Sequence, residues 1–452
     1  MNKLPISWAT AELGEIASFV MGQAPNAKDC NMDGVGSVFV KAGEFGKAIP
    51  IVREWTTKPL KFAESGDVLI CVVGATAGKL NLAIDCAIGR SVAAIRPEFE
   101  TPQKYIYYFL VSQTEKLRQG STGSAQGVIS KPDLAGITIP LAPGAEQTRI
   151  AQKLDELLAQ VDTLKARINA IPSLLKHFRQ SILASAVSGR LTEEWRQCGT
   201  KNPSNEKLPL PPDNIEIYAE DSVYAPDGWT LTALGNLCSF QQGLQIAKSE
   251  RRPTLELDTL PILRTINYEN DFTEDVHYAT ITKKSIIAEQ RDIILSRTGT
   301  VGRVLTGHRG IMHNNSFRIN FNEQHLSREF LICYLRSPQC QSYIKKKSGK
   351  SSQPDLTHKE FSKSPIIVPP CCEQTEIVRR VEQLFAFADQ LEVKVASAKS
   401  RIDHLTQSIL AKAFRGELVP QAPNDEPASV LLERMRAQRS AAPKAKRGRK
   451  ST

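Results

Sequence analysis

Two glycine-bearing turns carry residues that are suited to contact phosphate. VVGATAGKL occupies residues 72–80 and SRTGTVGRV residues 296–304, and each places a basic residue, Lys79 or Arg303, directly after its second glycine. The first stretch is not a P-loop, because its glycines are one residue too close and Leu80 replaces the Ser or Thr that would hold Mg²⁺. One interpretation is a plain turn between strands. The other is a loop that brings backbone amides and a cation to a nucleic-acid phosphate.

A second pair of segments is small, hydroxyl-rich and basic. RQGSTGSAQGVISKPDL at 118–134 aligns with KKKSGKSSQPDLTHKEF at 345–361. Glutamine offers both the donor and the acceptor that an adenine edge requires, and hydroxyl and basic side chains suit phosphate. A solvent-exposed loop is the competing interpretation. The aligned candidates for contact are Arg118, Ser124 and Gln126 in the first segment and Lys345, Ser351 and Gln353 in the second.

No catalytic or metal-binding motif accompanies these loops. The sequence contains no HExxH, no GxSxG, no Asn-Pro-Pro-Phe or Asp-Pro-Pro-Tyr methyltransferase motif and no Walker A motif. Its nine cysteines include no CxxC pair and are expected to be reduced thiols of a cytoplasmic protein. We therefore expect neither an active site nor a metal site in this chain.

The elements that must position the loops occur twice. EQTRIAQKLDELLAQVD at 146–162 returns as EQTEIVRRVEQLFAFAD at 373–389, 227 residues later, and QSILASAVSGRL at 180–191 returns at the same offset as QSILAKAFRGEL. A weaker repeat opens each half, LPISWATAELGEIASFVMG at 4–22 and APDGWTLTALGNLCSFQQG at 225–243. The chain is thus an internal duplication of a variable block followed by a well-matched block.

The well-matched blocks have the heptad spacing of long helices that pair with each other. Pro172 is expected to kink the first helix, and Gly189 and Gly416 fall where a C-terminal cap is expected. The seam is predicted to include Leu154, Leu157, Val161, Leu164, Ile168, Leu175, Phe178 and Ile182, and in the second copy Val381, Leu384, Leu391, Val395, Ile402, Leu405 and Ile409.

The variable blocks alternate strand-like runs with turns, and an aromatic-bearing helical run follows in each, at 104–120 and at 328–347. The predicted fold class is α+β, with two mixed α/β domains separated by two long helices in an antiparallel intramolecular coiled coil and related by a pseudo-twofold duplication. The expected boundaries are 1–142 and 225–368 for the domains, 143–192 and 369–420 for the helical spacers, 193–224 for a linker and 421–452 for a basic tail.

The charge is unevenly distributed. The 452 residues carry a formal net charge of +10. Residues 430–452 hold eight basic residues against Glu433 and supply most of the excess, and their last part, PKAKRGRKST, is expected to be a disordered basic arm. No apolar stretch has the length of a membrane span, and the start MNKLPISW does not read as a secretory signal.

The duplication of a block that opens with Pro-x-x-Trp and a helical block that begins Pro-x-x-Glu-Gln, at 143–147 and 370–374, resembles the specificity subunit of type I restriction-modification systems. The resemblance covers essentially the whole chain, and the helix endings look like those of the enterobacterial branch. It implies two target-recognition domains, each reading half of a bipartite, asymmetric sequence in double-stranded DNA, with the helices fixing the gap.

The resemblance also implies the partners. Two methyltransferase subunits would bind S-adenosylmethionine and modify adenine, and motor-nuclease subunits would use ATP and Mg²⁺ to restrict DNA, whereas this chain would bind no cofactor. Outward helix faces would dock the methyltransferases. Loop position and residue type add further candidates for DNA contact: Lys41, Lys79 and Arg90 in the first domain, and Arg264, Arg297, Arg303, Asn314 and Asn315 in the second. The alternatives are a fused enzyme whose motif is unrecognised, and a coiled-coil scaffold or DNA-binding regulator without a methyltransferase partner.

Overall fold

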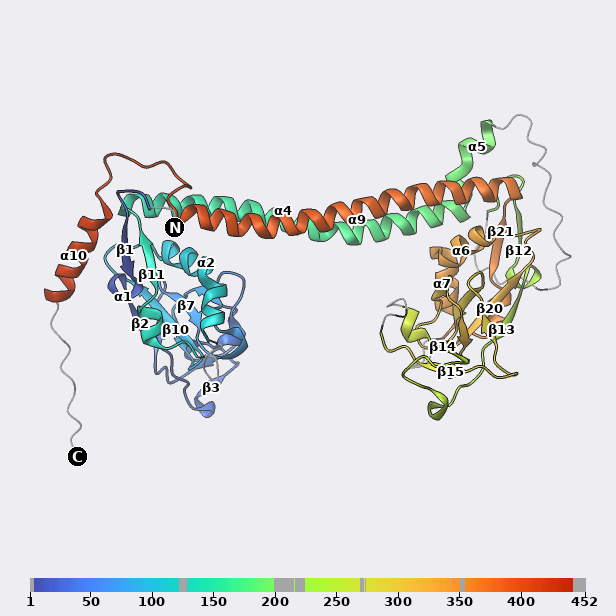
Figure 1. Ribbon diagram of the computed structural model, residues 1–452, viewed down its shortest axis with the longest axis horizontal. Helices are drawn as coiled ribbons and strands as arrows, with labels where there is room; N and C mark the ends of the chain where they lie inside the picture. The colour runs from blue at the N-terminus through green and yellow to red at the C-terminus, as the bar shows by residue number, and fades with distance from the viewer. Residues whose placement is uncertain are drawn as a thin grey trace. The chain divides into compact units, whose positions relative to one another are not determined.

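The computed structural model describes residues 4–121, 128–198, 215, 224–268, 272, 274–349 and 354–441. The chain divides into two compact units (Figure 1). The first unit combines Met1–Asn169 with Ala396–Thr452, and the second is Ala170–Val395. Each unit therefore joins one α/β domain to the start of the long helix that follows it and to the end of the long helix from the other repeat.

The first domain is built from three sheets. Its strands are β1 (Ala9–Glu12), β2 (Ala17–Met21), β3 (Cys30–Asn31), β4 (Ser37–Val40), β5 (Trp55–Thr56), β6 (Phe62–Ala63), β7 (Val68–Cys71), β8 (Leu80–Leu82), β9 (Cys86–Ile88), β10 (Val92–Pro97) and β11 (Thr138–Leu141). The sheets have the orders β1-β11, β2-β10-β7-β8 and β3-β5-β4-β9-β6. The pair β4 and β9 is parallel, and the other strand pairs in these sheets are antiparallel.

The second domain repeats this topology. Its strands are β12 (Thr230–Ala233), β13 (Cys238–Gln242), β14 (Thr259–Leu263), β15 (Tyr278–Thr280), β16 (Ile287–Ala288), β17 (Ile293–Ser296), β18 (Val304–Leu305), β19 (Gly310–Met312), β20 (Ser316–Phe321) and β21 (Pro365–Val368). The orders β12-β21 and β13-β20-β17-β18 match the first domain strand for strand. The parallel pair β14 and β19 takes the place of β4 and β9. The predicted mixed α/β duplication is confirmed.

A central strand in each domain is buried on both faces, which explains its unbroken apolar sequence. In β7, Val68 and Ile70 belong to one hydrophobic core, and Leu69 and Cys71 belong to another. In β17, the side chains likewise alternate between two cores. This strand therefore fixes the two layers of its domain.

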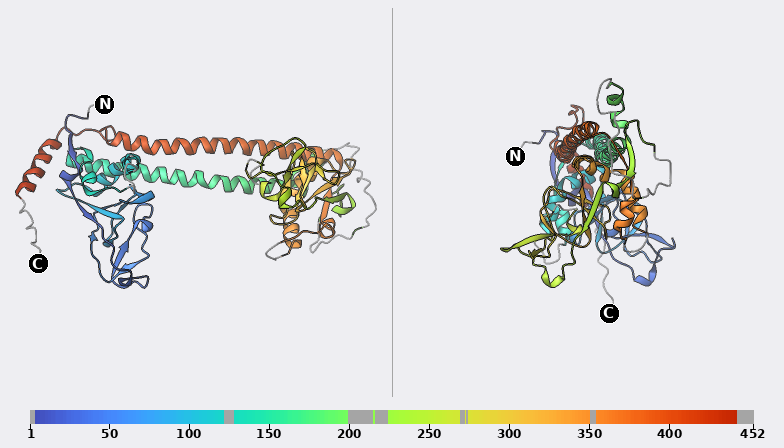
Figure 2. Two further views of the ribbon diagram at one scale, coloured as in Figure 1. Left: turned by 60° about the horizontal axis from the view of Figure 1, so that its bottom comes forward. Right: turned by 90° about the vertical axis from the view of Figure 1, so that its right-hand side faces the viewer.

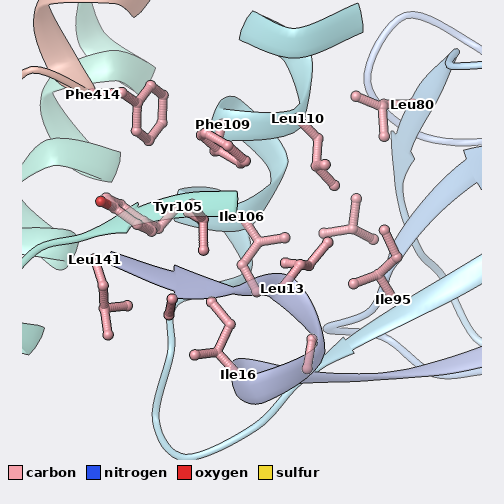
Figure 3. Close-up of a cluster of buried hydrophobic side chains, with 14 of the residues drawn as sticks. Leu13, Ile16, Leu80, Ile95, Tyr105, Ile106, Phe109, Leu110, Leu141 and Phe414 are labelled. Atoms are coloured by element: carbon pink, nitrogen blue, oxygen red, sulfur yellow. The ribbon is translucent and has the colours of Figure 1, made fainter. Parts of the chain in front are cut away.

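Helices cover one of these cores. In the first domain α2 (Gln103–Ser121) presents Tyr105, Ile106, Phe109 and Leu110 to the cluster drawn in Figure 3. The second domain has two helices there, α6 (Arg328–Arg336) and α7 (Pro338–Lys347). The prediction of a single helical run over 328–347 is wrong at one place: Ser337 caps the N-terminus of α7, and Pro338 cannot continue α6 because it lacks an amide hydrogen. Short helices α1 (Leu13–Ile16), α3 (Lys131–Ala135) and α8 (His358–Ser362) complete the domains.

The long helices are α4 (Gly144–Val187) and α9 (Cys371–Ala413). In the first unit the start of α4 lies beside the end of α9, where Lys165 Nζ is 2.9 Å from Asp403 Oδ1. In the second unit the end of α4 lies beside the start of α9, where Arg179 Nη1 is 2.6 Å from Glu392 Oε1. The paired stretches are therefore antiparallel in both units (Figures 1 and 2). The helix continues through Pro172, which does not end it.

Most predicted seam residues are removed from solvent. The buried ones are Leu154, Val161, Leu175, Ile182, Val381, Ile402 and Ile409, and the half-buried ones are Leu157, Ile168, Leu384, Leu391 and Val395. Leu164 and Leu405 depart from the pattern, since each is 44% exposed, and Phe178 is 36% exposed. A strict heptad spacing therefore overstates burial at these three positions.

Each long helix begins with a buried Glu–Gln pair that holds the tryptophan at the start of its own domain. In the first unit Trp8 Nε1 donates to Glu146 Oε2 (3.1 Å), and in the second Trp229 Nε1 donates to Glu373 Oε2 (2.8 Å). The neighbouring glutamines, Gln147 and Gln374, donate to backbone carbonyls. We call the two arrangements the first and second latch. They give the Pro-x-x-Glu-Gln and Pro-x-x-Trp motifs a structural role.

The residues that follow each long helix complete the latch at the start of the other long helix. Gly189 and Gly416 adopt positive φ angles of 78° and 76° just beyond α4 and α9, as the expected caps require. In the first latch Gln421 Nε2 donates to Oε1 of Glu146 (2.6 Å), the carboxylate oxygen that Trp8 does not bind. In the second latch Thr192 and Arg196 both donate to Oε1 of Glu373, the carboxylate oxygen that Trp229 does not bind.

Part of the C-terminal segment is helical. Residues 428–441 form a helix, α10 (Ala428–Ala441), which packs on the first domain through buried Leu432 and Met435. Arg439 donates to the carbonyl of Ala17 (2.9 Å) and to Glu98 (2.8 Å). The predicted disordered arm, PKAKRGRKST, begins after this helix. Residues 442–452 lie outside the described residues.

All nine cysteines are free thiols, as predicted. Burial raises the pKa of Cys71 to about 11 and that of Cys86 to about 12, so both are inert packing residues rather than nucleophiles. Among the described residues, no helix is long and apolar enough to cross a membrane.

Candidate nucleic-acid interface

The two glycine-bearing segments are turns between strands. One joins β7 to β8 with Gly74 and Gly78 at positive φ, and the other joins β17 to β18 with Gly299 and Gly302 at positive φ. This geometry agrees with the plain-turn interpretation, because the left-handed conformation itself requires glycine. Phosphate contact at these turns stays a prediction.

The basic residues of the turns have different surroundings. Lys79 Nζ donates to the carbonyl of Phe45 (2.8 Å), which ties the turn to a neighbouring loop. Arg303 is exposed, and its amide donates to Ser296 Oγ (2.8 Å). Lys79 therefore has a structural task that the sequence did not reveal, whereas Arg303 faces solvent.

The structure brings the end of each hydroxyl-rich segment against the glycine-bearing turn of its own domain. Val128 forms a β-bridge with Val73 in the first domain, and Asp355 forms one with Thr298 in the second. The two kinds of candidate loop are thus neighbours in both domains. Arg118 and Lys345 are exposed near the ends of α2 and α7. Four predicted contacts, Ser124, Gln126, Ser351 and Gln353, lie outside the described residues.

Apart from Arg297, which lies in the turn between β17 and β18, the remaining candidates lie at the carboxyl ends of the parallel strand pairs. In the first domain Lys41 follows β4, and Arg90 lies in the turn after β9. In the second domain Arg264 follows β14, and Asn314 lies in the turn after β19. The strand register is the same, with Val40 opposite Ile88 and Leu263 opposite Met312. We call these places the first and second strand-end sites.

Three of the basic residues predicted to contact DNA form ion pairs with carboxylates of this chain. Lys41 pairs with Glu54, whose hydrogen bond raises the pKa of the lysine. Arg264 Nη2 donates to Asp275 Oδ2 (2.9 Å). Arg297 makes a bidentate pair with Asp355 (2.9 and 2.7 Å) and is only 18% exposed. Each of these three side chains stabilises its own loop, and contact with DNA stays a prediction for them.

Arg90 is different. It is exposed and has no hydrogen-bond or ion-pair partner among the described residues. Its position in the turn is fixed, since Val92 N donates to Gly89 O (2.9 Å). The first strand-end site therefore presents an exposed guanidinium to solvent.

The second strand-end site presents amides. Asn314 Nδ2 donates to Gln245 Oε1, and the carbonyl of Asn314 accepts from Gln242 Nε2 (3.1 Å). The carbonyl of Asn315 accepts from the amide of Arg297 (2.8 Å), and its side chain bonds to His313. Sequence reasoning missed Gln245, which lies in the segment after β13. The Gly22 and Gly243 alignment was the signal that pointed to this segment.

A buried histidine supports the same site. His313 is 5% exposed, and its Nε2 lies 3.2 Å from Arg251 Nη2. Burial, followed by the charges of Arg251 and Arg264, lowers the pKa of His313, so the imidazole is neutral near neutral pH. Because an arginine only donates, Nε2 accepts and the proton lies on Nδ1. Neither His313 nor Arg251 stood out in the sequence.

Among the described residues, no three histidine, cysteine or acidic side chains come together as a metal site would require. The buried acidic side chains of the latches are engaged by tryptophan, glutamine, threonine and arginine.

The duplicated domains and antiparallel helix pairs define a fold shared with solved structures of type I restriction-modification proteins. The HsdS subunit from Thermoanaerobacter tengcongensis matches with a TM-score of 0.58 and 20% identity, over 92% of this chain and 98% of that one. A chain from a structure on complex assembly and conformational transition of the type I R-M system matches with a TM-score of 0.64 and 19% identity, over 92% and 100%.

Sequence comparison identifies the family. The model of the type I restriction modification DNA specificity domain matches residues 5–173 and again residues 226–396. The chain is also 30% identical over 472 aligned positions to the type I restriction enzyme EcoDI specificity subunit of Escherichia coli, covering 100% of this chain and 99% of that protein. The chain therefore belongs to the type I restriction-modification specificity family, as its duplicated motifs predicted.

Proposed function

We propose that this chain reads a bipartite, asymmetric sequence in double-stranded DNA, with each α/β domain recognising one half. The observation that carries this proposal is the contrast at equivalent positions of one scaffold. Arg90 stands where the second domain has Asn314, and Ala24 stands where it has Gln245. Two domains of one topology with unlike polar groups at the same strand ends are suited to read unlike base sequences.

The paired helices would fix the unread gap between the half-sites. Two modest contacts on a rigid connection bind far more strongly than either alone, provided that the spacing fits both. Their outward faces would dock two methyltransferase subunits, which supply the S-adenosylmethionine chemistry on adenine. Motor-nuclease subunits, with ATP and Mg²⁺, would carry out restriction. This chain would contribute specificity and no catalytic group.

The decisive experiment is to express the chain with its methyltransferase subunits in a cell without other adenine methylation and to map the methylated adenines. We expect one motif with two different half-sites and a fixed gap. A palindromic footprint that forms without any methyltransferase would favour a DNA-binding regulator instead. Methyl transfer from labelled S-adenosylmethionine to DNA by the purified chain alone would show a fused enzyme and would overturn the non-catalytic role.

A further inference from the structure

The segment after β13 holds an exposed glutamine on a firmly anchored backbone. Leu244 N donates to the carbonyl of Met312 (3.0 Å), and Asn314 N donates back to the carbonyl of Leu244 (3.0 Å). On the other side of Gln245, Ile246 is 7% exposed in a hydrophobic cluster with Ile262 and Ile311. Gln245 itself is exposed. Its backbone is therefore fixed while its side chain faces solvent, as base recognition requires.

The rest of the segment is held equally well. Arg251 Nη2 donates to the carbonyl of Ile246 (2.9 Å) and contacts His313 Nε2. Glu250 Oε2 accepts from the amide of Ala247 (2.8 Å). Arg251 is half-buried, so its guanidinium stabilises the loop and does not face solvent. These bonds restrict the positions that Gln245 can adopt.

Asn314 orients the glutamine amide. Its Nδ2 donates to Gln245 Oε1, so the Gln245 oxygen retains one lone pair and its Nε2 retains both donors. No further hydrogen bond to the Gln245 side chain occurs among the described residues. An amide in this state donates from Nε2 to adenine N7 and accepts at Oε1 from adenine N6, which is the bidentate pairing that distinguishes A·T in the major groove.

The equivalent place in the first domain has different chemistry. Gln23 N donates to the carbonyl of Ile88 (3.0 Å), as Leu244 N does to Met312, so Ala24 corresponds to Gln245. The turn 89–92 corresponds to 313–316, since Ser316 N donates to His313 O (3.1 Å) as Val92 N does to Gly89 O. The first strand-end site thus replaces the amide pair by Ala24 and the exposed Arg90. A guanidinium is the group that reads guanine O6 and N7.

We propose that Gln245 is a specificity-determining residue of the second domain that reads adenine, that Asn314 is its positioning residue, and that Arg90 reads guanine from the equivalent site of the first domain. This inference rests on the proposed function, and it names the base chemistry of each half. It also changes the role predicted for Asn314, which positions the Gln245 side chain instead of contacting a base itself.

The test uses the full chain with its methyltransferase subunits and maps methylated adenines for each variant. Q245A is expected to lower the preference for one A·T pair of the second half-site by about tenfold, with the first half-site and the gap unchanged. Q245E is expected to shift that same position toward C·G, because a carboxylate accepts from cytosine N4 and cannot donate to adenine N7. R90A is expected to relax one G·C pair of the first half-site only.

Two further variants separate reading from positioning and from backbone contact. N314A is expected to relax the same base pair as Q245A but less strongly, and the double variant is expected to add little to Q245A. K248A is the matched control, an exposed cation in the same segment, for which any loss should be uniform across sequences. Thermal melting should be the same for Q245A and the wild type, because the side chain is exposed.

The inference and the proposed function fail differently. If the wild-type chain gives no two-part motif, the proposed function fails. If the wild type gives a two-part motif and Q245A leaves every position of it unchanged, or reduces methylation equally at all sequences, the assignment of Gln245 as a base-reading residue is overturned.

Discussion

The two latches share their tryptophan and glutamate but differ in what completes them. In the first, Glu146 accepts from Trp8 and from the neutral Gln421. In the second, Glu373 accepts from Trp229, Thr192 and the cation Arg196. A buried carboxylate with a paired cation depends on that partner far more than one with neutral donors. The repeat therefore preserves the geometry of the joint while its electrostatics diverge.

The two strand-end sites also share their backbone geometry and differ in their side chains. One backbone register presents an arginine in the first domain and an amide pair in the second. Residues 229–367 hold 19 basic and 13 acidic residues, whereas residues 1–140 hold 14 and 13. The duplicated scaffold places the groups, and the side chains that differ between its copies decide what each copy can bind.

The largest expected difference lies between the latches. Glu373→Ala should lower the free energy of unfolding of the second unit by about 3–5 kcal/mol, because it leaves Arg196, whose side chain is 17% exposed, without its anion. Glu146→Ala should cost the first unit about 1–3 kcal/mol. Urea unfolding followed by hydrogen exchange of peptides from each unit measures both. Equal losses would contradict the electrostatic distinction.

The C-terminal helix should matter to the first unit alone. Arg439→Ala removes bonds to the carbonyl of Ala17 and to Glu98, and it should destabilise the first unit by about 1–3 kcal/mol. Arg434→Ala is the control, since its pair with Glu426 is about half exposed on both sides and should contribute under about 1 kcal/mol. A similar loss in the second unit, measured by the same peptides, would refute this localisation.

Equivalent seam positions should respond unequally. Leu391 is half-buried, so Leu391→Ala should cost about 1–2 kcal/mol, whereas Leu164, at 44% exposed, should tolerate alanine within about 0.5 kcal/mol. Chemical denaturation of the two single variants tests this. A larger loss of stability for Leu164→Ala than for Leu391→Ala would show that the heptad pattern predicts the packing of Leu164 better than its exposed fraction does.

The smallest effect concerns pH at the first latch. Burial raises the pKa of Glu146 above 4.5, although bonds from Trp8 and Gln421 lower it part of the way. In the folded state Glu146 then keeps its proton to higher pH than in the unfolded state. The stability that Glu146 contributes is therefore complete below pH 4.5 and declines as the pH rises through the pKa of the folded state. Comparing Glu146→Gln with the wild type from about pH 4 to about pH 7 should show that the wild type loses stability relative to the variant. Parallel profiles would contradict the shift.

Much of the fold was predictable because it depends on repetition and periodicity. The 227-residue repeat follows from matched residue types, and the pairing of the long helices follows from their heptad spacing. The helical run at 328–347 was harder, because Ser337 and Pro338 divide an otherwise continuous pattern. The surroundings of the candidate site residues were not predictable. Arg297 pairs with Asp355, which is 58 residues away in the sequence.

The sequence by itself determined the duplication, the helix–domain order and the family, since these properties are encoded by residue type and spacing along the chain. Only the tertiary structure decided which polar groups remain available. Lys41, Arg264 and Arg297 are neutralised by carboxylates that folding brings to them, and Gln245 is oriented by an asparagine 69 residues away. A hydrogen bond depends on distance and direction in space, and neither is fixed until the strands that carry both partners have paired.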